Sequence, residues 1–350
     1  MHEQVFKAAI LEKSSKPLII DDVQLPGELL AGQVLVRMIY SGICGAQLNE
    51  IDAAKGPDKF LPHMLGHEGY GEVLEIGPLV KHVAVGNKVV LHWMPGAGIQ
   101  SDPAKYLWRN KVLNAGWVTT FSEMTIVSEN RCTPIKSSLD PKYLPLLGCA
   151  ATTAVGVIGR DANLRLGESV VVIGTGGVGL LTIQAARASG GYPIIGVDRI
   201  SERLKFAEQL GAHFVFNSTG QDILEKIKSA LDGKMPDVVI ETSGNRSMIE
   251  LAYQLVMHGG RCVLVGVPRH DDPASIDTLP LHFDTVFIGS KGGGTRPEVD
   301  ILRIARLAEA GLFQLDSLPV QLFSLDGIND AIKMVRDGLP GRAVVDMSRE

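Results

Sequence analysis

The chain has 350 residues and a formal net charge of −5, from 34 basic and 39 acidic residues. This length is about twice that of a typical single domain, so two domains with separate cores are expected. The basic residues form no run that suggests a nucleic-acid or membrane-surface partner, and no apolar run reaches the ~18 residues of a membrane span. Because the N-terminal segment also lacks a signal-peptide pattern, we expect a cytoplasmic protein that acts on a small molecule.

The first part of the chain, residues 1–150, carries short β-like runs separated by Gly, Pro and Asn turns. This pattern of short β-like runs and turn residues predicts a β-rich domain. One run, at 34–42, is followed by Cys44, and a later glycine-rich loop holds His67 and Glu68. Taken alone, a single cysteine is most often a small buried residue, and a histidine beside an acid is most often an ordinary surface residue. A functional role for these side chains therefore depends on their partners.

The four cysteines lie far apart in the sequence and form no C-x-x-C pair, which argues against a disulfide framework and a zinc knuckle. Any metal site must therefore be assembled by the fold. Cys149 lies where the β-rich part ends, in the segment "LLGCAATTAVGV". Together with Cys44 and His67 it matches the Cys₂His ligand set of a catalytic zinc, which keeps a fourth position for water or substrate.

The central part of the chain, residues 151–295, alternates apolar strand-like runs with helical segments. Continuous apolar strands joined through helices are typical of a parallel sheet that is covered on both faces. We therefore predict a doubly wound α/β domain. Its strand-like runs lie at 169–174, 192–198, 213–217, 236–244, 261–267 and 285–290.

The segment "VVIGTGGVGLL" follows the first of these strands with Gly174, Gly176 and Gly179 in G-x-G-x-x-G spacing. The first glycine permits a tight turn, the second lets the backbone approach a pyrophosphate, and the third lets helix and strand pack closely. The next strand ends at Asp198, where an acid accepts hydrogen bonds from ribose hydroxyls and repels a 2′-phosphate. NAD(H) is therefore favoured over NADP(H), although the adjacent Arg199 works against this preference. Two further residues of the predicted cofactor loop are Gly177 and Val178.

The C-terminal segment, residues 296–350, predicts a helix at 297–311, a strand at 320–324, a helix at 325–338 and a strand at 342–347. It contains no dinucleotide motif, so we assign it to the first domain. That domain is therefore expected to be discontinuous in sequence.

Several motifs occur in the order found in one enzyme family, namely "GICG", "LGHEGYGEV", "GNKVV", "GCAATTAVG", "VVIGTGGVGLL", "ETSGN", "GGRCVLVGV" and "GRAVVDM". Through them, essentially the whole chain resembles the zinc-type medium-chain alcohol dehydrogenases. The resemblance implies a GroES-like catalytic domain and a Rossmann domain that binds NAD(H). It also implies that Cys44, His67 and Cys149 bind a catalytic zinc. Glu68 would lie just behind them, able to approach the metal as an exchanging ligand.

The same resemblance implies further roles. Val267 would lie where the family's backbone holds the nicotinamide carboxamide, and Arg342 resembles the arginine that pairs with the pyrophosphate. Trp93 stands where the family has a large apolar wall of the substrate pocket. The family also pairs subunits through an edge strand, which corresponds here to 284–290, so a homodimer or homotetramer is expected.

The chain departs from the family at three positions of the zinc-site segment. Ala46 replaces the Ser or Thr that passes the alcohol proton onward, and a methyl group cannot carry a proton. Gln47 replaces an Asp that orients the ligand histidine, which leaves the site one negative charge short. Asn49 stands where some relatives have a relay histidine. Either the proton passes through water, a neighbouring hydroxyl of the substrate, Thr152 or Glu68, or activity with simple alcohols is low.

The loop at 96–113 lacks the four cysteines that bind a structural zinc in many relatives. One catalytic zinc per chain, and no structural zinc, is therefore expected. The loop instead holds Tyr106, Trp108, Arg109 and Lys111, which indicates that packing of side chains replaces the metal. A role in subunit contact or in the capture of an anionic substrate is the alternative.

The sequence thus predicts a zinc-dependent, NAD(H)-linked dehydrogenase that oxidises a secondary alcohol to a ketone, or catalyses the reverse. A polyol, cyclitol or sugar-derived substrate is favoured, because a neighbouring hydroxyl could replace the missing Ser or Thr. Two alternatives remain open. A zinc-independent reductase of activated double bonds or quinones from the same superfamily would lack the metal ligands. A non-catalytic dinucleotide-binding protein would form no NADH with any polyol.

Overall fold

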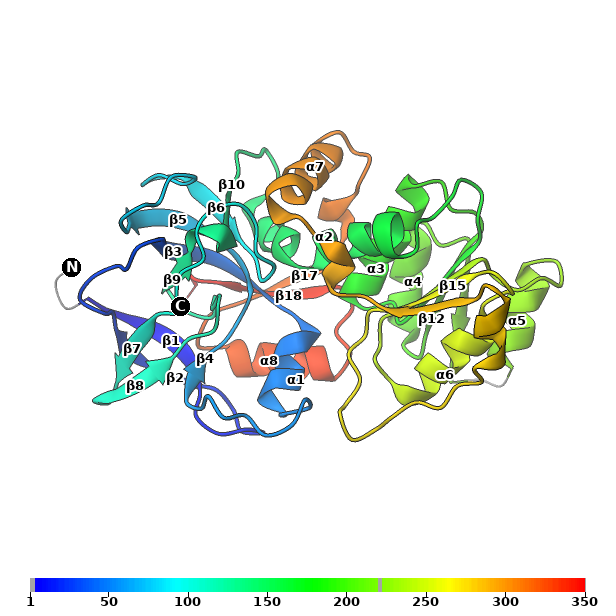
Figure 1. Cartoon of the computed structure of the whole chain (residues 1–350), viewed down its shortest axis with the longest axis horizontal. Helices are drawn as coiled ribbons and strands as arrows, with labels where there is room; N and C mark the ends of the chain where they lie inside the picture. Colours follow the sequence, from blue (N-terminus) through cyan, green and yellow to red (C-terminus); the bar gives the residue numbers. More distant parts are fainter. Residues whose placement is uncertain (1–3, 220–221, 350) are drawn as a thin grey trace. The chain divides into compact units, whose positions relative to one another are not determined.

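The computed structural model describes residues 4–219 and 222–349, so the other positions of the predicted domains lie outside the described residues. The chain divides into two compact units (Figure 1). Unit 1 comprises Met1–Cys149, Arg296–Glu309 and Val320–Glu350, and unit 2 comprises Ala150–Thr295 and Ala310–Pro319.

The observed units differ from the expected division of the chain at Ala150, which we assigned to the first domain and which lies in unit 2, and in one longer segment. We assigned residues 310–319 to the first domain, whereas the structure groups them with unit 2. The described segment contributes no strand to a unit 1 sheet. Instead, the Gln184 side chain of unit 2 donates a hydrogen bond to the Gln314 carbonyl at 3.1 Å. This contact gives a physical reason for the correction.

Unit 1 consists of a closed barrel, with strand order β1-β2-β7-β8-β4, and a seven-stranded sheet. Six strands of this sheet lie in the order β10-β6-β5-β3-β18-β17, and the seventh, β9, pairs with β3 outside that order. The first half of β3 also pairs with β9, and the second half pairs with β18, so β3 lies at the centre of the sheet. The N-terminal strands are β1 (Val5–Leu11), β2 (Ile19–Gln24), β3 (Gln33–Ile43), β4 (His63–Met64), β5 (Glu68–Ile76), β6 (Lys88–Leu91), β7 (Lys105–Trp108), β8 (Lys111–Asn114), β9 (Met124–Ser128) and β10 (Cys132–Pro134). Among the described residues, the helices that accompany them are α1 (Gly45–Ile51) and the 3₁₀ helices η1 (Glu129–Arg131) and η2 (Pro141–Gly148).

The C-terminal segment completes the sheet of unit 1. It contains α7 (Pro297–Glu309), β17 (Val320–Phe323), α8 (Ile328–Arg336) and β18 (Arg342–Asp346). β18 pairs antiparallel with β3, with Ala343 opposite Ile43, and parallel with β17. α8 packs its apolar face, which includes Ile328 and Ala331, into the same core cluster as Ile43. This pairing carries Arg342, at the start of β18, to the end of β3.

The loop that lacks the structural-zinc cysteines forms the β7–β8 hairpin. Tyr106 and Trp108 are buried in the barrel core, and the Tyr106 hydroxyl accepts a hydrogen bond from a backbone N–H of β9. Trp108 Nε1 donates to Asp21 Oδ2 at 2.8 Å. Arg109 Nε donates to the same oxygen, and its guanidinium lies 4.7 Å from the Trp108 ring centroid. The predicted packing of this loop is therefore confirmed for three of its side chains, while Lys111 is exposed.

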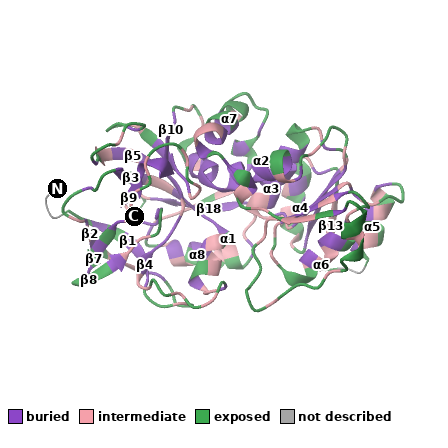
Figure 2. Cartoon of the chain, in the orientation of Figure 1, coloured by how far each residue is buried: buried purple, intermediate pink, exposed green. Residues whose placement is uncertain are grey.

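Unit 2 contains a six-stranded parallel sheet with strand order β13-β12-β11-β14-β15-β16. In chain order this is the 3-2-1-4-5-6 arrangement of a Rossmann domain, whose switch point lies between β11 and β14. Residues of β11, β12 and β14 are buried throughout, as the predicted continuous apolar runs require (Figure 2). The strands are β11 (Val170–Ile173), β12 (Ile194–Asp198), β13 (Phe214–Asn217), β14 (Val238–Glu241), β15 (Arg261–Leu264) and β16 (Val286–Gly289).

The α-helices of unit 2 are α2 (Ala150–Gly156), α3 (Gly177–Ala188), α4 (Ser201–Gln209), α5 (Ile223–Ala230) and α6 (Arg246–Leu255). Helices α3 to α6 connect successive parallel strands, as a doubly wound sheet requires. Among the described residues, no single helix has both the length and the apolar composition needed to cross a membrane. One bent pair, 141–148 with 150–161, satisfies that test by length and composition alone.

Candidate metal and cofactor sites

Four side chains of unit 1 come together in one cluster. Cys44, His67, Glu68 and Cys149 each offer one ligand atom, and these atoms lie within 4.8 Å of one another. In the described part of the chain, no other His, Cys, Asp and Glu side chains form a comparable group of three or more. The structure thus brings the predicted zinc ligands together, and zinc binding itself stays a prediction.

Strand register and helix packing explain how the cluster forms. In the β3–β5 pair Gly42 lies opposite Glu68, so Cys44, two residues further along, follows the end of β3 that adjoins the start of β5. η2 packs against β3, β5 and β6, and Cys149 follows it. A Cβ atom at Gly148 would overlap a backbone carbonyl oxygen of β6. Glycine at that position therefore permits the close approach that places Cys149.

The two cysteine sulfurs differ in protonation. A hydrogen bond from Cys149 and the neighbouring His67 lower the pKa of Cys44 well below its usual range, although burial opposes this. The same hydrogen bond, together with burial, raises the pKa of Cys149 well above its usual range. Burial lowers the pKa of His67, but Cys44 and Glu68 beside it outweigh burial and the net shift is upward. The shared hydrogen bond therefore favours the thiolate form of Cys44 over that of Cys149.

Glu68 is fully buried and forms an ion pair with Arg342, which is also buried. Burial raises the pKa of Glu68, and the guanidinium opposes that rise. Burial disfavours the charged guanidinium, but the negative charges of Glu68, Cys44 and Cys149 outweigh it and raise the pKa of Arg342. The predicted pyrophosphate contact of Arg342 is not tested by this arrangement and stays a prediction.

Sequence reasoning missed two features of this ion pair. It did not connect Arg342 with Glu68, because the two residues are 274 positions apart. It also gave no role to Gly42, where a Cβ atom would overlap Glu68 Oε2. The repeated glycines of "SGICG" and "GHEGYG" are the signal that could have indicated closely packed strands at this point.

The cluster has the donors that a zinc ion needs. Glu68 Oε1 is buried and has no hydrogen-bond partner among the described residues, and the buried His67 Nε2 faces the Cys44 thiol. Such unpartnered buried polar atoms are rare unless a ligand or an ordered water satisfies them. Two thiols and an imidazole match the soft and borderline ligands that zinc prefers. The residues therefore fit the metal that the resemblance implies.

The three departures from the family lie on α1. Ala46 and Asn49 are half-buried, whereas Gln47 is buried. The Gln47 side chain accepts a hydrogen bond from the Cys44 backbone N–H and contacts the ring of His67. Gln47 thus occupies the position from which an Asp would orient the histidine.

The two other predicted pocket residues have defined places within their own units. Trp93 follows β6, is half-buried and packs against the core cluster that contains Val34 and Leu91. Its backbone carbonyl accepts a hydrogen bond from Arg131. Thr152 is buried in α2 of unit 2. The contacts of Trp93 and Thr152 with a substrate stay predictions.

The glycine-rich segment forms the loop between β11 and α3. Gly174 has φ +87°, a left-handed conformation that favours glycine. A Cβ atom at Gly179 would overlap the carbonyl oxygen of Gly174, so only glycine allows helix and loop to pack this closely. Gly176 caps α3, whose first two residues are Gly177 and Val178. The loop therefore has the conformation that places a phosphate at the N-terminus of α3.

Asp198 ends β12 beside this loop. Its Oδ2 accepts hydrogen bonds from Thr175 N at 2.7 Å and Oγ1 at 3.2 Å, and its Oδ1 accepts one from Ile200 N at 2.9 Å. Oδ2 already accepts two hydrogen bonds, whereas Oδ1 accepts one and has a second lone pair that can still accept from a ribose hydroxyl. The cation beside it is Arg203, with Nη1 3.6 Å from Asp198 Oδ2, whereas Arg199 is exposed. The sequence alone did not indicate Arg203.

Val267 follows β15 at the same carboxyl-end edge of the sheet. It is 48% exposed, and its backbone packs against Gly244, which follows β14. Thr242, also after β14, donates a hydrogen bond to the Gly174 carbonyl at 2.6 Å. The predicted cofactor residues of unit 2 therefore share the sheet edge where dinucleotides bind in this type of domain.

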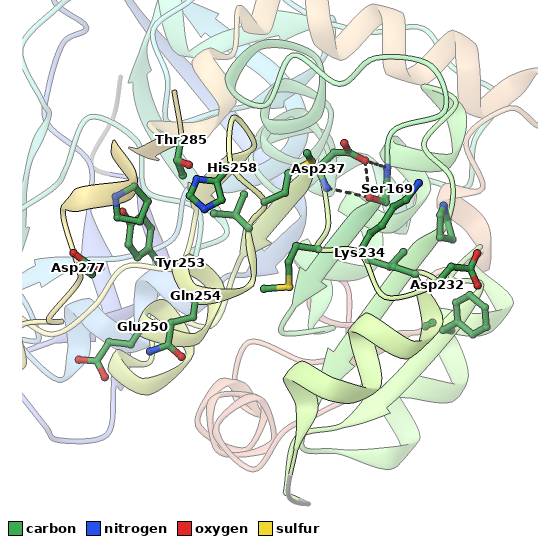
Figure 3. A pocket seen from close by; sticks show the side chains of 18 of the residues that line it. Ser169, Asp232, Lys234, Asp237, Glu250, Tyr253, Gln254, His258, Asp277 and Thr285 are labelled. Carbon is green, nitrogen blue, oxygen red and sulfur yellow. Dashed lines mark hydrogen bonds between the residues drawn. The ribbon is translucent and has the colours of Figure 1, made fainter. Parts of the chain in front are cut away.

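A cavity of about 1220 Å³ in unit 2 lies at the opposite edge of the sheet (Figure 3). Ser169, Asp237 and Thr285, which line it, immediately precede β11, β14 and β16. Figure 3 shows Ser169 and Asp237 hydrogen-bonded to each other in its wall. Because this cavity adjoins the amino ends of the strands, it is distinct from the dinucleotide edge.

Comparison with known proteins agrees with the two units. An alcohol dehydrogenase GroES-like domain matches residues 30–137, and a zinc-binding dehydrogenase domain matches residues 177–304. An alcohol dehydrogenase of Geobacillus stearothermophilus is 30% identical over 347 residues, covering 97% of this chain and 99% of the relative.

Two solved structures share the fold over 99% of this chain and 100% of their own chains. One is an alcohol dehydrogenase zinc-binding domain protein from Burkholderia ambifaria, with a TM-score of 0.90 and 25% identity. The other is the benzyl alcohol dehydrogenase of Acinetobacter calcoaceticus, with a TM-score of 0.89 and 26% identity. With the Cys₂His cluster in a GroES-like unit and the glycine-rich loop in a Rossmann unit, the chain belongs to the zinc-type medium-chain alcohol dehydrogenase family.

Proposed function

We propose that this alcohol dehydrogenase is zinc-dependent and NAD(H)-linked, and that it oxidises a secondary alcohol of a polyol, cyclitol or sugar-derived substrate to a ketone, or catalyses the reverse. The observation that carries the proposal is the buried cluster of Cys44, His67, Glu68 and Cys149. We place the reaction in the cytoplasm, with a small-molecule alcohol or ketone as the partner and neither nucleic acid nor membrane involved.

The proposed ligands are Cys44, His67 and Cys149, with Glu68 as an exchanging fourth. Zinc bound there would supply a Lewis acid that polarises the substrate oxygen and so eases loss of the alcohol proton. Two thiolates would balance the charge of a divalent ion, while Arg342 balances Glu68. The ion pair engages Glu68 Oε2, and Oε1 is the atom without a partner among the described residues. Arg342 would thus limit how strongly Glu68 competes for the metal.

The residues of the proposed cofactor site would bind NAD(H). The loop from Gly174 to Gly179 would hold the pyrophosphate at the N-terminus of α3, and Asp198 would accept from the adenosine ribose. The backbone at Val267 would hold the nicotinamide carboxamide, and Arg342 would pair with the pyrophosphate. NAD(H) held by these residues would supply the hydride acceptor or donor of the reaction.

The structure also bears on the two alternative functions. A zinc-independent reductase has no need of two cysteines and a histidine gathered in the protein interior, and this chain has them. The non-catalytic alternative predicts that no NADH forms with any alcohol. A panel of polyols, cyclitols and sugar alcohols, followed by NADH absorbance with and without a zinc chelator, separates all three functions. Chelator-sensitive NADH formation is the expected result.

Cofactor choice depends on Asp198. We expect Asp198→Ala to weaken NAD binding about tenfold or more, because a charged hydrogen-bond acceptor is worth about 1.5–3 kcal/mol. The advantage of NAD over NADP should narrow as well, since the carboxylate no longer repels a 2′-phosphate. Titration of both cofactors against wild type and variant measures both effects. A wild type that prefers NADP would show that Arg203 and Arg199 outweigh the acid.

Substrate preference depends on Ala46. If the protein lacks a hydroxyl at this point of the proton path, a hydroxyl beside the reacting carbon can take its place. General acid–base assistance is worth about 10² to 10⁴ in rate. We therefore expect vicinal diols to show kcat/KM at least about tenfold above mono-alcohols of the same size.

Two isosteric variants control for shape in that comparison. Ala46→Thr restores a hydroxyl and should narrow the difference between diols and mono-alcohols, whereas Ala46→Val adds the same bulk and should leave it unchanged. Equal rates for matched diols and mono-alcohols in the wild type would remove the physical basis of the polyol proposal.

We further propose a homodimer or homotetramer that pairs through β16, the edge strand of the unit 2 sheet. An edge strand presents unpaired backbone groups to a partner. Apolar side chains in and near β16, among them Val286 and Phe283, are exposed. We also propose that each chain holds one zinc and no structural zinc, because side chains of the β7–β8 hairpin pack where many relatives bind the second ion.

A further inference from the structure

Gln47 joins the first turn of α1 to the candidate zinc ligand His67. The side chain is buried, with 1% of its surface exposed. Its Oε1 accepts a hydrogen bond from the Cys44 backbone N–H at 3.1 Å. Its Nε2 lies 2.5 Å from His67 Nδ1. Both ends of the amide are therefore engaged, one by a helix N-terminus and the other by the imidazole ring.

The helix fixes which end of the amide faces the histidine. Cys44 is the N-cap of α1 and Gln47 is its third residue, so the side chain reaches back to an N–H that the helix leaves without a partner. A backbone N–H can only donate, so it selects the amide oxygen. The end that remains for His67 is the NH₂ group, which can also only donate.

This orientation decides the tautomer of His67. Because the amide NH₂ donates to Nδ1, that nitrogen must carry a lone pair, and a neutral ring then has its proton on Nε2. Nε2 is the buried ring nitrogen that faces the sulfur atoms of Cys44 and Cys149. A histidine binds a metal through a nitrogen that has lost its proton. The amide thus favours the tautomer that cannot bind zinc through Nε2.

We infer that Gln47 is a positioning residue that holds His67 in the Nε2–H tautomer and thereby weakens zinc binding at this site. This inference rests on the proposed zinc-dependent function and deepens it. For His67 to bind the ion, its proton must move to Nδ1. The amide must then turn over, which presents NH₂ to the Cys44 N–H, or break its contact with the ring. Either way one buried hydrogen bond is lost.

A carboxylate at this position would remove the conflict. Glu has the same shape as Gln, and both of its oxygens accept hydrogen bonds. One oxygen could accept from the Cys44 N–H while the other accepts from a protonated Nδ1, so Nε2 would be free for the metal. Partners of ligand histidines typically change metal affinity by about 10 to 100-fold. We expect Gln47→Glu to tighten zinc binding by a factor in this range.

The test measures zinc affinity of the full chain by competition with a chromophoric chelator, independently of turnover. It compares wild type, Gln47→Glu and Gln47→Met, where Met keeps the length of the side chain without either polar group. Because Met removes the opposing NH₂, Gln47→Met should bind zinc at least as tightly as wild type. Weaker binding by Gln47→Met, together with no gain from Gln47→Glu, would show that the amide supports the metal and would overturn the inference.

A second measurement needs no variant and no metal. In metal-free wild-type protein, nitrogen-15 NMR of the His67 ring should show a protonated Nε2 and an unprotonated Nδ1. The reverse assignment would contradict the inference even if Gln47→Glu failed to fold. The proposed function fails separately: if neither wild type nor either variant binds zinc, the cluster is not a zinc site. If all three bind zinc equally, the function stands and the inference is wrong.

Discussion

Replacement of Cys44 by alanine is expected to lower turnover by at least about 10³-fold while leaving NADH binding nearly unchanged. Lewis-acid stabilisation by a metal is worth several kcal/mol, and each 1.36 kcal/mol is tenfold in rate. The neighbours of Cys44 lower its pKa and so favour its charged form, and its removal takes away the proposed ligand that most readily carries a negative charge toward the metal. The glycine-rich loop and Asp198 belong to unit 2, whereas Cys44 belongs to unit 1, so we expect NADH binding to survive the substitution.

The matched control is Cys132→Ala, since Cys132 is another buried cysteine of unit 1. It lies in the core cluster around β3 and β6 and is not part of the candidate metal cluster. Cys132→Ala should keep wild-type turnover. NADH formation with the best substrate and a fluorescence titration with NADH measure the two properties. Full activity of Cys44→Ala would refute its role, whereas loss of NADH binding as well would indicate misfolding.

Removal of Arg342 is expected to produce the largest change in stability. Arg342→Met leaves Glu68 buried in its charged form without a partner, and breaking such a pair typically destabilises a protein by about 3–5 kcal/mol. The double variant Glu68→Gln with Arg342→Met has no buried charge at either position. It should recover most of the loss, because the two residues act as a coupled pair.

Chemical unfolding followed by tryptophan fluorescence suits this test. The tryptophans at 93, 108 and 117 all belong to unit 1, so the signal reports on the unit that contains the ion pair. The midpoint should fall for Arg342→Met and rise again in the double variant. A single variant within about 1 kcal/mol of wild type would mean that Glu68 becomes protonated at little cost once the arginine is gone.

Much of unit 2 could be predicted from the sequence, because its signals are local. Each buried strand is a continuous apolar run, and the glycine spacing from Gly174 to Gly179 lies within one loop. Asp198 follows at the end of the next strand. The local conformation agrees with those predictions, since Gly174 has a positive φ and Gly179 packs on its carbonyl oxygen. Residues close in sequence constrain one another directly, which is why pattern reasoning succeeded there.

The candidate metal cluster is different, because its members come from separate segments of the chain. Spacing alone could not bring Cys44, His67 and Cys149 together, and the expectation came from family resemblance. The strand pairing of β3 with β5 and the packing of η2 assemble them. Arg342 reaches the same place through the pairing of β18 with β3, and no local pattern reports such a distant strand pair. The segment 310–319 was misassigned for a similar reason, since only tertiary contacts link it to unit 2.

Metal content tests the central claim most directly. Protein purified without a chelator should contain close to one zinc per chain when measured by inductively coupled plasma mass spectrometry. The cluster of Cys44, His67 and Cys149 is the proposed site for that one ion, and the β7–β8 hairpin has no cysteine for a second. Two zinc ions per chain, or none in a preparation that still forms NADH from an alcohol, would contradict the account.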